Sequence, residues 1–301
     1  MKSSDGTRWR AEDRPCPVCG SRRAKKLGAR GGRAHHEGKG VETCVVRCRD
    51  CKVAYTSPTL IPESNPYAKA SAKEYFQLHD SQQKILQGEV LAAFAEKVLG
   101  GPGRMLELGC GRGELLKGAL NRGWSVYGVE MTEDFAQVAR SHGVEVECSS
   151  IEDCRSLDRT YDVILLAAIL EHLYDPMETL KRVRNSCRPG GLVLIDVPNE
   201  SSLTMRIGNL YMRARGRDWA TNLSPTFSPF HVVGFSPTSL RHALSSAGFR
   251  VHSLHVPKWN NALPQGRTMG RKIERVGLSI VQAIGEAIGM GDGITCWAIR
   301  E

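Results

Sequence analysis

The stretch "RMLELGCGRGELL", residues 104–116, constrains the fold more than any other part of the chain. A short apolar run ends in three glycines at alternate positions, and a second apolar run at helical spacing follows. Glycine permits a sharp turn and a close approach of the backbone to a ligand. The helix start that follows offers free N–H groups. The stretch therefore predicts a strand, a ligand-binding turn and a helix.

Short apolar runs recur along the rest of the 301-residue chain and alternate with helical stretches. This alternation is typical of a parallel sheet covered by helices. The runs occupy residues 104–109, 125–130, 144–150, 161–168, 191–198, 250–256 and 293–300. We predict an α/β fold with a doubly wound, seven-stranded, mostly parallel and Rossmann-like sheet. Its ligand is expected beyond the carboxyl ends of the strands.

Two Cys-x-x-Cys pairs stand near the beginning of the chain. Cys16 and Cys19 form the first pair, and Cys48 and Cys51 form the second, with Cys44 as an alternative ligand. Four thiolates suit a tetrahedral structural zinc site, and they leave the ion no open position for a substrate. We therefore predict a small zinc ribbon that the metal stabilises, with no catalysis at zinc.

Composition separates this ribbon from the sheet. Residues 1–60 contain 14 Lys and Arg against six Asp and Glu, so most of the net charge of +9 lies there. A patch of this kind either binds an anion such as nucleic acid or is a solvated surface. We predict a zinc-ribbon segment at 1–57, a linker and covering helix at 58–100, and the ligand-binding domain at 101–301. Insertions are expected at 199–227 and 258–290.

Four polar residues end or follow predicted strands or precede a helix. Glu130 ends the second strand, where a carboxylate can accept hydrogen bonds from the ribose hydroxyls of a nucleoside cofactor. Glu171 and His172 follow the fourth strand. His231 precedes a helix predicted at 236–249, which has a Ser N-cap, a Pro in its first turn and a Gly stop. His172 and His231 are open to a catalytic or a structural reading.

The glycine turn has the pattern E-x-G-x-G-x-G, whereas a dinucleotide site needs G-x-G-x-x-G. "LELGCGRGELL" resembles the first motif of class I S-adenosylmethionine-dependent methyltransferases. The order "CPVCGS…RCRDCKVAYTSPT" before such a core resembles a bacterial group with an N-terminal zinc-binding segment. That group includes enzymes of glycan, nucleotide-sugar and secondary-metabolite pathways. The likeness spans residues 14 to about 255.

The resemblance implies a cofactor site along the carboxyl edge of the sheet. Met131 would lie against the adenine, and Tyr75 would cover the cofactor. Many members carry Asp where this chain has Ser150, so Asp153 or Glu152 is an alternative partner for the adenine amino group. The predicted cofactor-binding residues are Tyr75, Glu107, Gly109, Cys110, Gly111, Gly113, Glu130, Met131, Ser150, Ile151 and Ala167.

The resemblance also implies catalytic residues. The "EHL" after the fourth strand would place Glu171 and His172 near the methyl-transfer face, and His231 would face the acceptor as base or substrate ligand. In related quinone-pathway O-methyltransferases, a carboxylate three residues before the Glu helps to hold a metal. Here that position is Ala168. We therefore predict no catalytic metal.

Two functions remain open from the sequence. The first is in-line methyl transfer to a hydroxyl of a sugar or secondary metabolite, and the alternative is an RNA methyltransferase whose basic ribbon docks its substrate. The chain lacks the Asn-Pro-Pro-Tyr motif of methyltransferases that act on the exocyclic amines of bases. Ten cysteines without an apolar leader predict a cytoplasmic protein. Residues 270–290 offer a dimer seam, with a membrane-surface helix as the alternative.

Overall fold

A computed structural model describes residues 1–3, 6–64, 81–259 and 269–301, with the side chains of 269–273 excepted. Its centre is the predicted seven-stranded sheet, in the order β12-β13-β10-β9-β6-β7-β8. The strands are β6 (Arg104–Leu108), β7 (Ser125–Glu130), β8 (Glu145–Cys148), β9 (Tyr161–Ala167), β10 (Cys187–Pro198), β12 (Phe249–His255) and β13 (Gly293–Arg300). Only β13 runs antiparallel, to both β10 and β12. The predicted fold class is confirmed.

The order of the strands reverses between β6 and β9, which pair in parallel. The chain moves outward from β6 through β7 to β8 and then returns to β9 and β10 on the other side of β6. In sheets of this kind the ligand crevice opens at such a reversal, beyond the carboxyl ends of the strands. The candidate site is therefore at the ends of β6 and β9.

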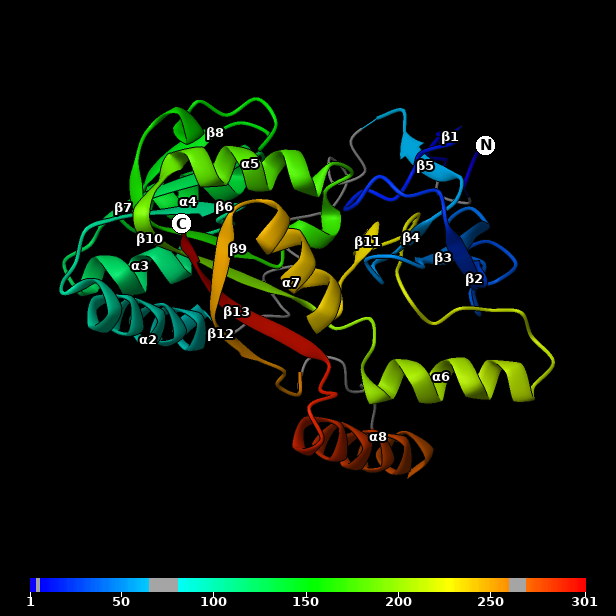
Figure 1. Cartoon of the computed structure of the whole chain (residues 1–301). Helices are drawn as coiled ribbons and strands as arrows, with labels where there is room; N and C mark the ends of the chain where they lie inside the picture. Colours follow the sequence, from blue (N-terminus) through cyan, green and yellow to red (C-terminus); the bar gives the residue numbers. More distant parts are fainter. Residues whose placement is uncertain (4–5, 65–80, 260–268) are drawn as a thin grey trace.

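Helices cover both faces of the sheet (Figure 1). One face packs against α2 (Ser81–Leu99), α3 (Glu114–Asn121) and α4 (Glu133–Ser141), and the other packs against α5 (Pro176–Ser186) and α7 (Pro237–Ser246). Successive strand residues alternate between the two cores: Leu106 and Leu108 face one, and Met105 faces the other. This alternation is the two-residue period of a strand buried on both sides.

Particular residues explain how one predicted helix begins and how another packs. In α7, Ser236 is the N-cap and forms a capping box with Ser239, and Pro237 begins the helix, as predicted. Helix α2 packs closely on α3 because both helices carry a glycine at the contact. A Cβ at Gly88 would lie 2.2 Å from the Leu115 carbonyl oxygen, and one at Gly118 would lie 2.2 Å from that of Ile85. The first part of the predicted covering helix, residues 70–80, lies outside the described residues.

The N-terminal lobe is built from two small sheets. Strands β2 (Ala24–Arg30), β3 (Thr43–Cys48) and β4 (Ala54–Thr56) form a sheet with β11 (Val233–Gly234), in the order β11-β4-β3-β2. Strand β1 (Trp9–Glu12) pairs with β5 (Thr59–Pro62). Because β11 comes from the main domain, the lobe and the core share one sheet. The domain boundary at residue 57 stays a prediction.

The insertions hold α6 (Leu203–Ala214) and α8 (Met269–Ala287), which pack on one another below the core in Figure 1. Along α8 and directly after its end, four apolar side chains are at least half exposed: Val276, Ile280 and Ile284 in the helix, and Ile288 just beyond it. The dimer seam at 270–290 stays a prediction. Two short 3-10 turns, η2 (Ser156–Asp158) and η3 (Leu170–His172), complete the fold. Among the described helices, none combines the length and the apolar character needed to cross a membrane.

Candidate functional site

The glycine turn after β6 has the backbone that the sequence predicts. Gly109, Gly111 and Gly113 have φ angles of +67°, +54° and +72°, which favour glycine over other residues. A Cβ at Gly109 would lie 2.2 Å from Cδ1 of Ile169, which precedes η3. The glycine turn and the segment that carries Glu171 are therefore in direct contact.

Glu130 holds this turn in place. It ends β7 and is 8% exposed. Its Oε2 accepts a hydrogen bond from the Gly111 amide at 3.0 Å, and its Oε1 accepts one from the Thr132 amide at 2.9 Å. An ionised carboxylate has about four lone-pair positions, so acceptor capacity remains for a ligand. The predicted contact of Glu130 with a ribose stays a prediction, and the structure adds a second role for this residue.

Glu107 lies beneath the same turn and is buried. Burial raises its pKa to about 8, with smaller contributions from nearby charged groups. Its Oε2 has no hydrogen-bond partner among the described residues. A cationic ligand group would satisfy this oxygen. The residues of the turn therefore fit a cofactor that brings positive charge to the end of β6.

Cys110 contributes through its backbone. Its side chain is 6% exposed and belongs to the core on the α2 and α3 side of the sheet. A Cβ at Gly128 would lie 2.5 Å from the Cys110 Sγ, so the two residues pack tightly across adjacent strands. Burial raises the pKa of the thiol well above its ordinary range. Cys110 is therefore a packing residue that carries part of the turn.

The predicted adenine side lies at the ends of β7 and β8. Met131 is 43% exposed, while Ile151 is partly buried against the core. The Ser150 hydroxyl donates to Asp153 Oδ2 at 2.8 Å and accepts from the Asp153 amide at 3.1 Å. Ser150 and its predicted alternative, Asp153, thus form one polar unit. Glu152 beside them is exposed, and Tyr75 lies outside the described residues.

Three predicted catalytic residues come together beside the glycine turn, and we call them the Glu–His–His cluster: Glu171, His172 and His231. Nε2 of His172 lies 3.7 Å from Glu171 Oε1, and Nε2 of His231 lies 4.0 Å from the same oxygen. The two imidazole rings meet edge to face, with centroids 4.9 Å apart. The chain reaches this point through Ala167, which ends β9, and Ala168, which has a φ of +56°.

The electrostatics of the Glu–His–His cluster are dominated by burial. Glu171 is 2% exposed, and neither of its carboxylate oxygens has a hydrogen-bond partner among the described residues. Burial raises the pKa of Glu171 to about 8. It lowers the pKa of His172 to about 4 and that of His231 to about 3. Burial therefore favours the neutral form of all three side chains.

Backbone contacts tie the two segments of the cluster together. The Val232 amide donates to the Glu171 carbonyl at 2.9 Å. The His231 amide donates to Ser224 Oγ at 3.2 Å. His172 Nδ1 lies 3.3 Å from the carbonyl oxygen of Phe230. The positions of both imidazoles are therefore set by the fold before any ligand binds.

Two carboxyl groups near the cluster, the partly buried Asp196 and the buried Glu200, were not predicted. Asp196 on β10 lies opposite Ala167, accepts from Thr295 Oγ1 at 2.9 Å, and has a pKa that burial raises to about 6. Glu200 accepts from Asn222 Nδ2 at 2.7 Å and thereby holds the 199–227 insertion. The available signal was the sequence "LIDVPNE", in which both carboxylates stand at or just after a strand end.

The four predicted zinc ligands, Cys16, Cys19, Cys48 and Cys51, also meet, with all Sγ atoms within 4.8 Å of one another. The Sγ atoms of Cys16 and Cys51 are 3.4 Å apart, and those of Cys19 and Cys48 are 3.5 Å apart. Four sulfurs at about 2.3 Å from a tetrahedral zinc would be separated by about 3.8 Å. The set fits such an ion. Cys44 is outside the group.

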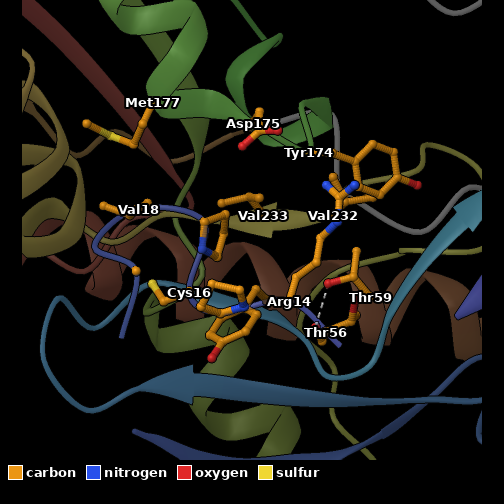
Figure 2. A pocket seen from close by; sticks show the side chains of 14 residues that line it. Arg14, Cys16, Val18, Thr56, Thr59, Tyr174, Asp175, Met177, Val232 and Val233 are labelled. Atoms are coloured by element: carbon orange, nitrogen blue, oxygen red, sulfur yellow. Dashed lines mark hydrogen bonds between the residues drawn. The ribbon is translucent and has the colours of Figure 1, made fainter. Parts of the chain in front are cut away.

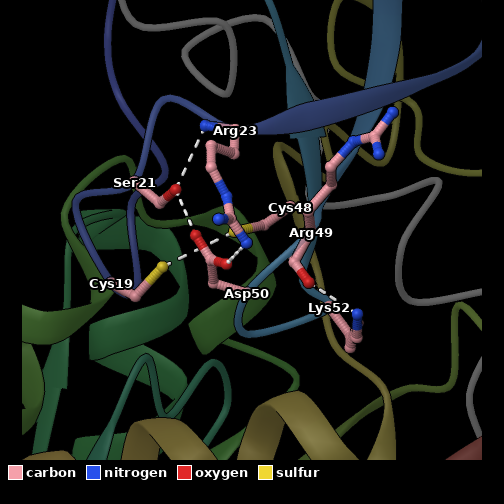
Figure 3. A network of polar contacts seen from close by, with 7 residues as sticks. All are labelled: Cys19, Ser21, Arg23, Cys48, Arg49, Asp50 and Lys52. Carbon is pink, nitrogen blue, oxygen red and sulfur yellow. Dashed lines mark hydrogen bonds and ion pairs between the residues drawn. The ribbon is translucent and has the colours of Figure 1, made fainter.

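Polar contacts fix the two Cys-x-x-Cys turns to one another (Figure 3). Asp50 accepts from the Ser21 hydroxyl at 2.5 Å and from the Arg23 guanidinium at 2.5 Å. The Lys52 ammonium donates to the Arg49 carbonyl at 2.5 Å. Each contact crosses between the turns or closes one of them. The sulfur geometry is therefore supported from outside the ligand set.

A cavity of about 420 Å³ opens where the lobe meets the core. Its walls include Arg14 and Cys16 from the lobe, Tyr174 and Met177 from the segment that runs into α5, and Val232. Figure 2 shows these side chains converging from both parts of the molecule. Two walls belong to the chain segments that carry His172 and His231. The cavity is thus adjacent to the segments of the Glu–His–His cluster.

The chain also matches a known protein family. A family model described as a methyltransferase domain matches residues 78–254, more than half of the chain. The chain belongs to this methyltransferase family. The predicted resemblance to class I S-adenosylmethionine-dependent methyltransferases is confirmed, and the protein is an enzyme of that class.

Several curated relatives are named ubiquinone biosynthesis O-methyltransferases. One from Aeromonas salmonicida (strain A449) is 27% identical over 176 residues, which cover 55% of this chain and 72% of the relative. Another, from Parvibaculum lavamentivorans, is 32% identical over 104 residues, which cover 33% of this chain and 41% of the relative. The chain thus spans only part of the length of these relatives.

Among solved structures, the plantazolicin methyltransferase BpumL in complex with S-adenosylhomocysteine (SAH) is similar. Its TM-score is 0.51 at 14% sequence identity, and the match covers 79% of this methyltransferase and 91% of that chain. At this identity the likeness concerns the fold. The acceptor of this methyltransferase has to be argued from its own residues.

Proposed function

We propose that this methyltransferase transfers the methyl group of S-adenosylmethionine to a hydroxyl of a small molecule. The observation that carries the proposal is the contact between the glycine turn and the segment of the Glu–His–His cluster, where Ile169 packs on Gly109. The turn is the part that resembles a cofactor site, and the cluster is the nearest set of groups able to receive an acceptor. Donor and acceptor positions are therefore neighbours.

On the donor side, the glycine turn and Glu107 would hold the methionine part of the cofactor, and Glu130 would hold its ribose. The cofactor supplies an activated methyl group on a sulfonium. In-line displacement then depends on alignment, which contributes on the order of 7–11 kcal/mol in favourable cases. The bonds from Gly111 and Thr132 to Glu130 keep the turn in one conformation. The chain therefore contributes by positioning the cofactor, and it does so with backbone groups of the glycine turn.

On the acceptor side, a hydroxyl must lose its proton as it attacks. A neutral imidazole beside the attacking oxygen contributes typically about 10²–10⁴-fold. The Glu–His–His cluster has two imidazoles that burial keeps neutral near pH 7. The curated relatives named O-methyltransferases support an oxygen acceptor. The cavity of about 420 Å³, whose walls include Tyr174 and Val232 from the segments that carry His172 and His231, would take the remainder of a sugar or secondary metabolite.

We further propose that the four cysteines bind structural zinc. A closed set of thiolates stabilises a small lobe and offers no position to a substrate. Strand β4 of this lobe pairs with β11, which begins two residues after His231. The ion would thereby support the segment that positions the acceptor site, without taking part in the chemistry.

The basic lobe favours a small acceptor over RNA, because many of its charges are paired within the protein. Five of its acidic residues, Glu12, Asp13, Glu37, Glu42 and Asp50, form ion pairs with neighbouring Arg, Lys or His. RNA binding by phosphate contacts weakens with salt at a slope of about −0.7 per single-strand contact. We expect a nearly flat dependence of acceptor affinity on salt. A steep slope would favour RNA.

His231→Ala tests the proposed function. Turnover with phenolic and sugar hydroxyl acceptors, followed as SAH release, should fall by about 10²–10⁴-fold. The affinity for S-adenosylmethionine in calorimetry should stay unchanged, because the glycine turn is intact. His242, exposed on α7, provides the matched control His242→Ala. Turnover of His231→Ala at the wild-type rate would remove the cluster from the mechanism.

A further inference from the structure

We propose that Glu171, His172 and His231 bind a divalent transition-metal ion. This inference rests on the proposed function, since it names how the Glu–His–His cluster receives the acceptor hydroxyl. It also revises the prediction of no catalytic metal. That prediction looked for a third ligand at position 168, which is alanine. The fold brings His231 from a distant part of the chain to complete a three-ligand set.

The geometry of the three side chains fits one ion. Their ligand atoms all lie within 4.8 Å of one another. Glu171 Oε1 is 3.7 Å from His172 Nε2 and 4.0 Å from His231 Nε2. Nitrogen and oxygen ligands at about 2.0–2.2 Å from a tetrahedral ion are separated by about 3.4 Å. Small side-chain rotations close this difference.

The carboxylate of Glu171 gives a second, independent reason. It is 2% exposed, and both of its oxygens are without a hydrogen-bond partner among the described residues. No Lys or Arg within the described ranges forms an ion pair with it; its neighbours in the ion-pair range are the two histidines. A buried carboxylate of this kind is costly unless a cation compensates it. A bound divalent ion would supply that charge.

His172 is oriented as a metal-ligating histidine commonly is. A ligating histidine usually donates its other ring N–H to a carbonyl or carboxylate, which fixes the ring and its tautomer. His172 Nδ1 lies 3.3 Å from the Phe230 carbonyl oxygen, and its Nε2 is the atom nearer to Glu171. The His231 and Glu171 segments are joined by the Val232 amide. The ligands are therefore held by their backbones before the ion arrives.

The donor set indicates the class of metal. Two imidazole nitrogens and one carboxylate oxygen suit Zn²⁺, Fe²⁺, Co²⁺ or Ni²⁺ better than Mg²⁺ or Ca²⁺, which prefer oxygen ligands. Three protein ligands also leave a coordination position open, as catalytic sites require. This is the difference from the four cysteines, where protein sulfurs fill every position.

The open position gives the acceptor hydroxyl a place beside the glycine turn. An ion there lowers the pKa of a bound hydroxyl. The hydroxyl proton passes to water, and the oxygen forms a bond to the methyl carbon of the cofactor. The carbon–sulfur bond breaks, its electron pair stays on sulfur, and the sulfonium becomes a neutral thioether. No oxidant or reductant is needed.

Cobalt titration of the full-length protein, with zinc already held by the four cysteines, tests the inference. We expect one equivalent of Co²⁺ per chain, with visible d–d absorption but without the thiolate-to-cobalt band that cysteine ligands produce. Glu171→Gln and His231→Ala should each weaken Co²⁺ binding by at least about 100-fold, more than the loss of an outer-shell partner. His242→Ala should bind as the wild type does. Calorimetric SAH affinity and circular dichroism would verify that each variant is folded.

Two results would overturn the metal site. One is the absence of Co²⁺ binding by the zinc-loaded wild type, and the other is unchanged binding by folded Glu171→Gln. Either result would leave the proposed function standing if His231→Ala still lowers turnover, since His231 would then act directly as the base. Failure of the proposed function is a separate outcome, namely wild-type turnover by His231→Ala. If all of the bound cobalt shows a thiolate band, it has displaced zinc from the cysteines and none occupies a second site, which is the first of these two results.

Discussion

The four-cysteine cluster and the Glu–His–His cluster are both sets of side chains of types that can bind a metal, but they are assembled in different ways. The cysteines come as two local pairs, each closed by a tight turn. Glu171 and His172 are adjacent in sequence, whereas His231 lies far from them in the chain. The segment that follows His231 is held by the pairing of β11 with β4. The closed thiolate set can stabilise a fold, while the three-ligand set leaves room for a reactant. The difference indicates that local spacing marks structural sites and that tertiary structure builds reactive ones.

The two clusters are also physically linked. Strand β4 follows the second cysteine pair, pairs with β11, and β11 follows His231. Loss of the lobe should therefore disturb the acceptor site, whereas loss of His231 should leave the lobe intact. The acceptor site is thus expected to depend on the lobe, while the lobe does not depend on the acceptor site.

Removal of the sulfur cluster should have the largest effect. Cys48→Ser, or chelation of zinc, should unfold the lobe, because apparent zinc-binding energies in small domains are roughly 10–16 kcal/mol. Circular dichroism and thermal melting would measure the loss. Cys148→Ser, at an exposed cysteine outside the cluster, is the control and should melt like the wild type. A Cys48→Ser protein that stays folded but is inactive would contradict a structural role.

Loss of the Glu130 carboxylate should act on the donor side alone. Glu130→Ala removes the bonds to the Gly111 and Thr132 amides and the predicted ribose contact. Hydrogen bonds to a charged group contribute about 1.5–3 kcal/mol each, so SAH binding should weaken by at least about 10-fold in calorimetry. Glu133→Ala, on the exposed side of α4, should bind SAH normally. Unchanged affinity for Glu130→Ala would remove this residue from the cofactor site.

The pH dependence of stability should expose Glu107. Its pKa is raised from an ordinary value of 4.5 to about 8 by burial, so between these values the folded protein holds a proton that the unfolded chain has lost. The contribution of Glu107 to stability is therefore complete below about pH 4.5 and is lost as the pH rises toward 8. Glu107→Gln should flatten this decline by up to about 1.4 kcal/mol per pH unit in urea denaturation without cofactor. An unchanged slope would contradict the assignment.

The smallest effect is expected for ion pairs at the surface of the lobe. The Lys26 ammonium meets the Asp218 carboxylate at 2.5 Å and thereby connects the lobe with the 199–227 insertion. Both side chains are well exposed, and such pairs contribute little. Lys26→Ala should leave the thermal midpoint and turnover unchanged. A marked loss of stability would mean that charge, more than the β4–β11 pairing, joins the lobe to the core.

Much of the fold was predictable because its signals are local. The two-residue period of Leu106 and Leu108 against Met105 follows from a strand buried on both faces. The Ser236 cap, the glycine turn and the cysteine spacing are likewise properties of a few adjacent residues. In these segments local preference and tertiary structure agree.

Several features depended on contacts between distant parts of the chain. The hydrogen bond from Gly111 to Glu130 joins the glycine turn to the end of β7. The 199–235 region supplies β11 to a sheet whose other three strands come from the N-terminal lobe. Asp196 and Glu200 read as ordinary strand-end acids until their burial is known. Distance along the chain carries no information about these contacts, because the packing of the whole sheet brings them about.

The amino-acid sequence by itself determined the seven-stranded class, the glycine turn and the four-sulfur set. Each depends on residue type and short spacing, which act through local backbone geometry. Only the tertiary structure decided that Glu171, His172 and His231 come together beside the glycine turn. The physical reason is that folding buries the Glu171 carboxylate, which has no hydrogen-bond partner among the described residues, and places two histidines from different segments beside it.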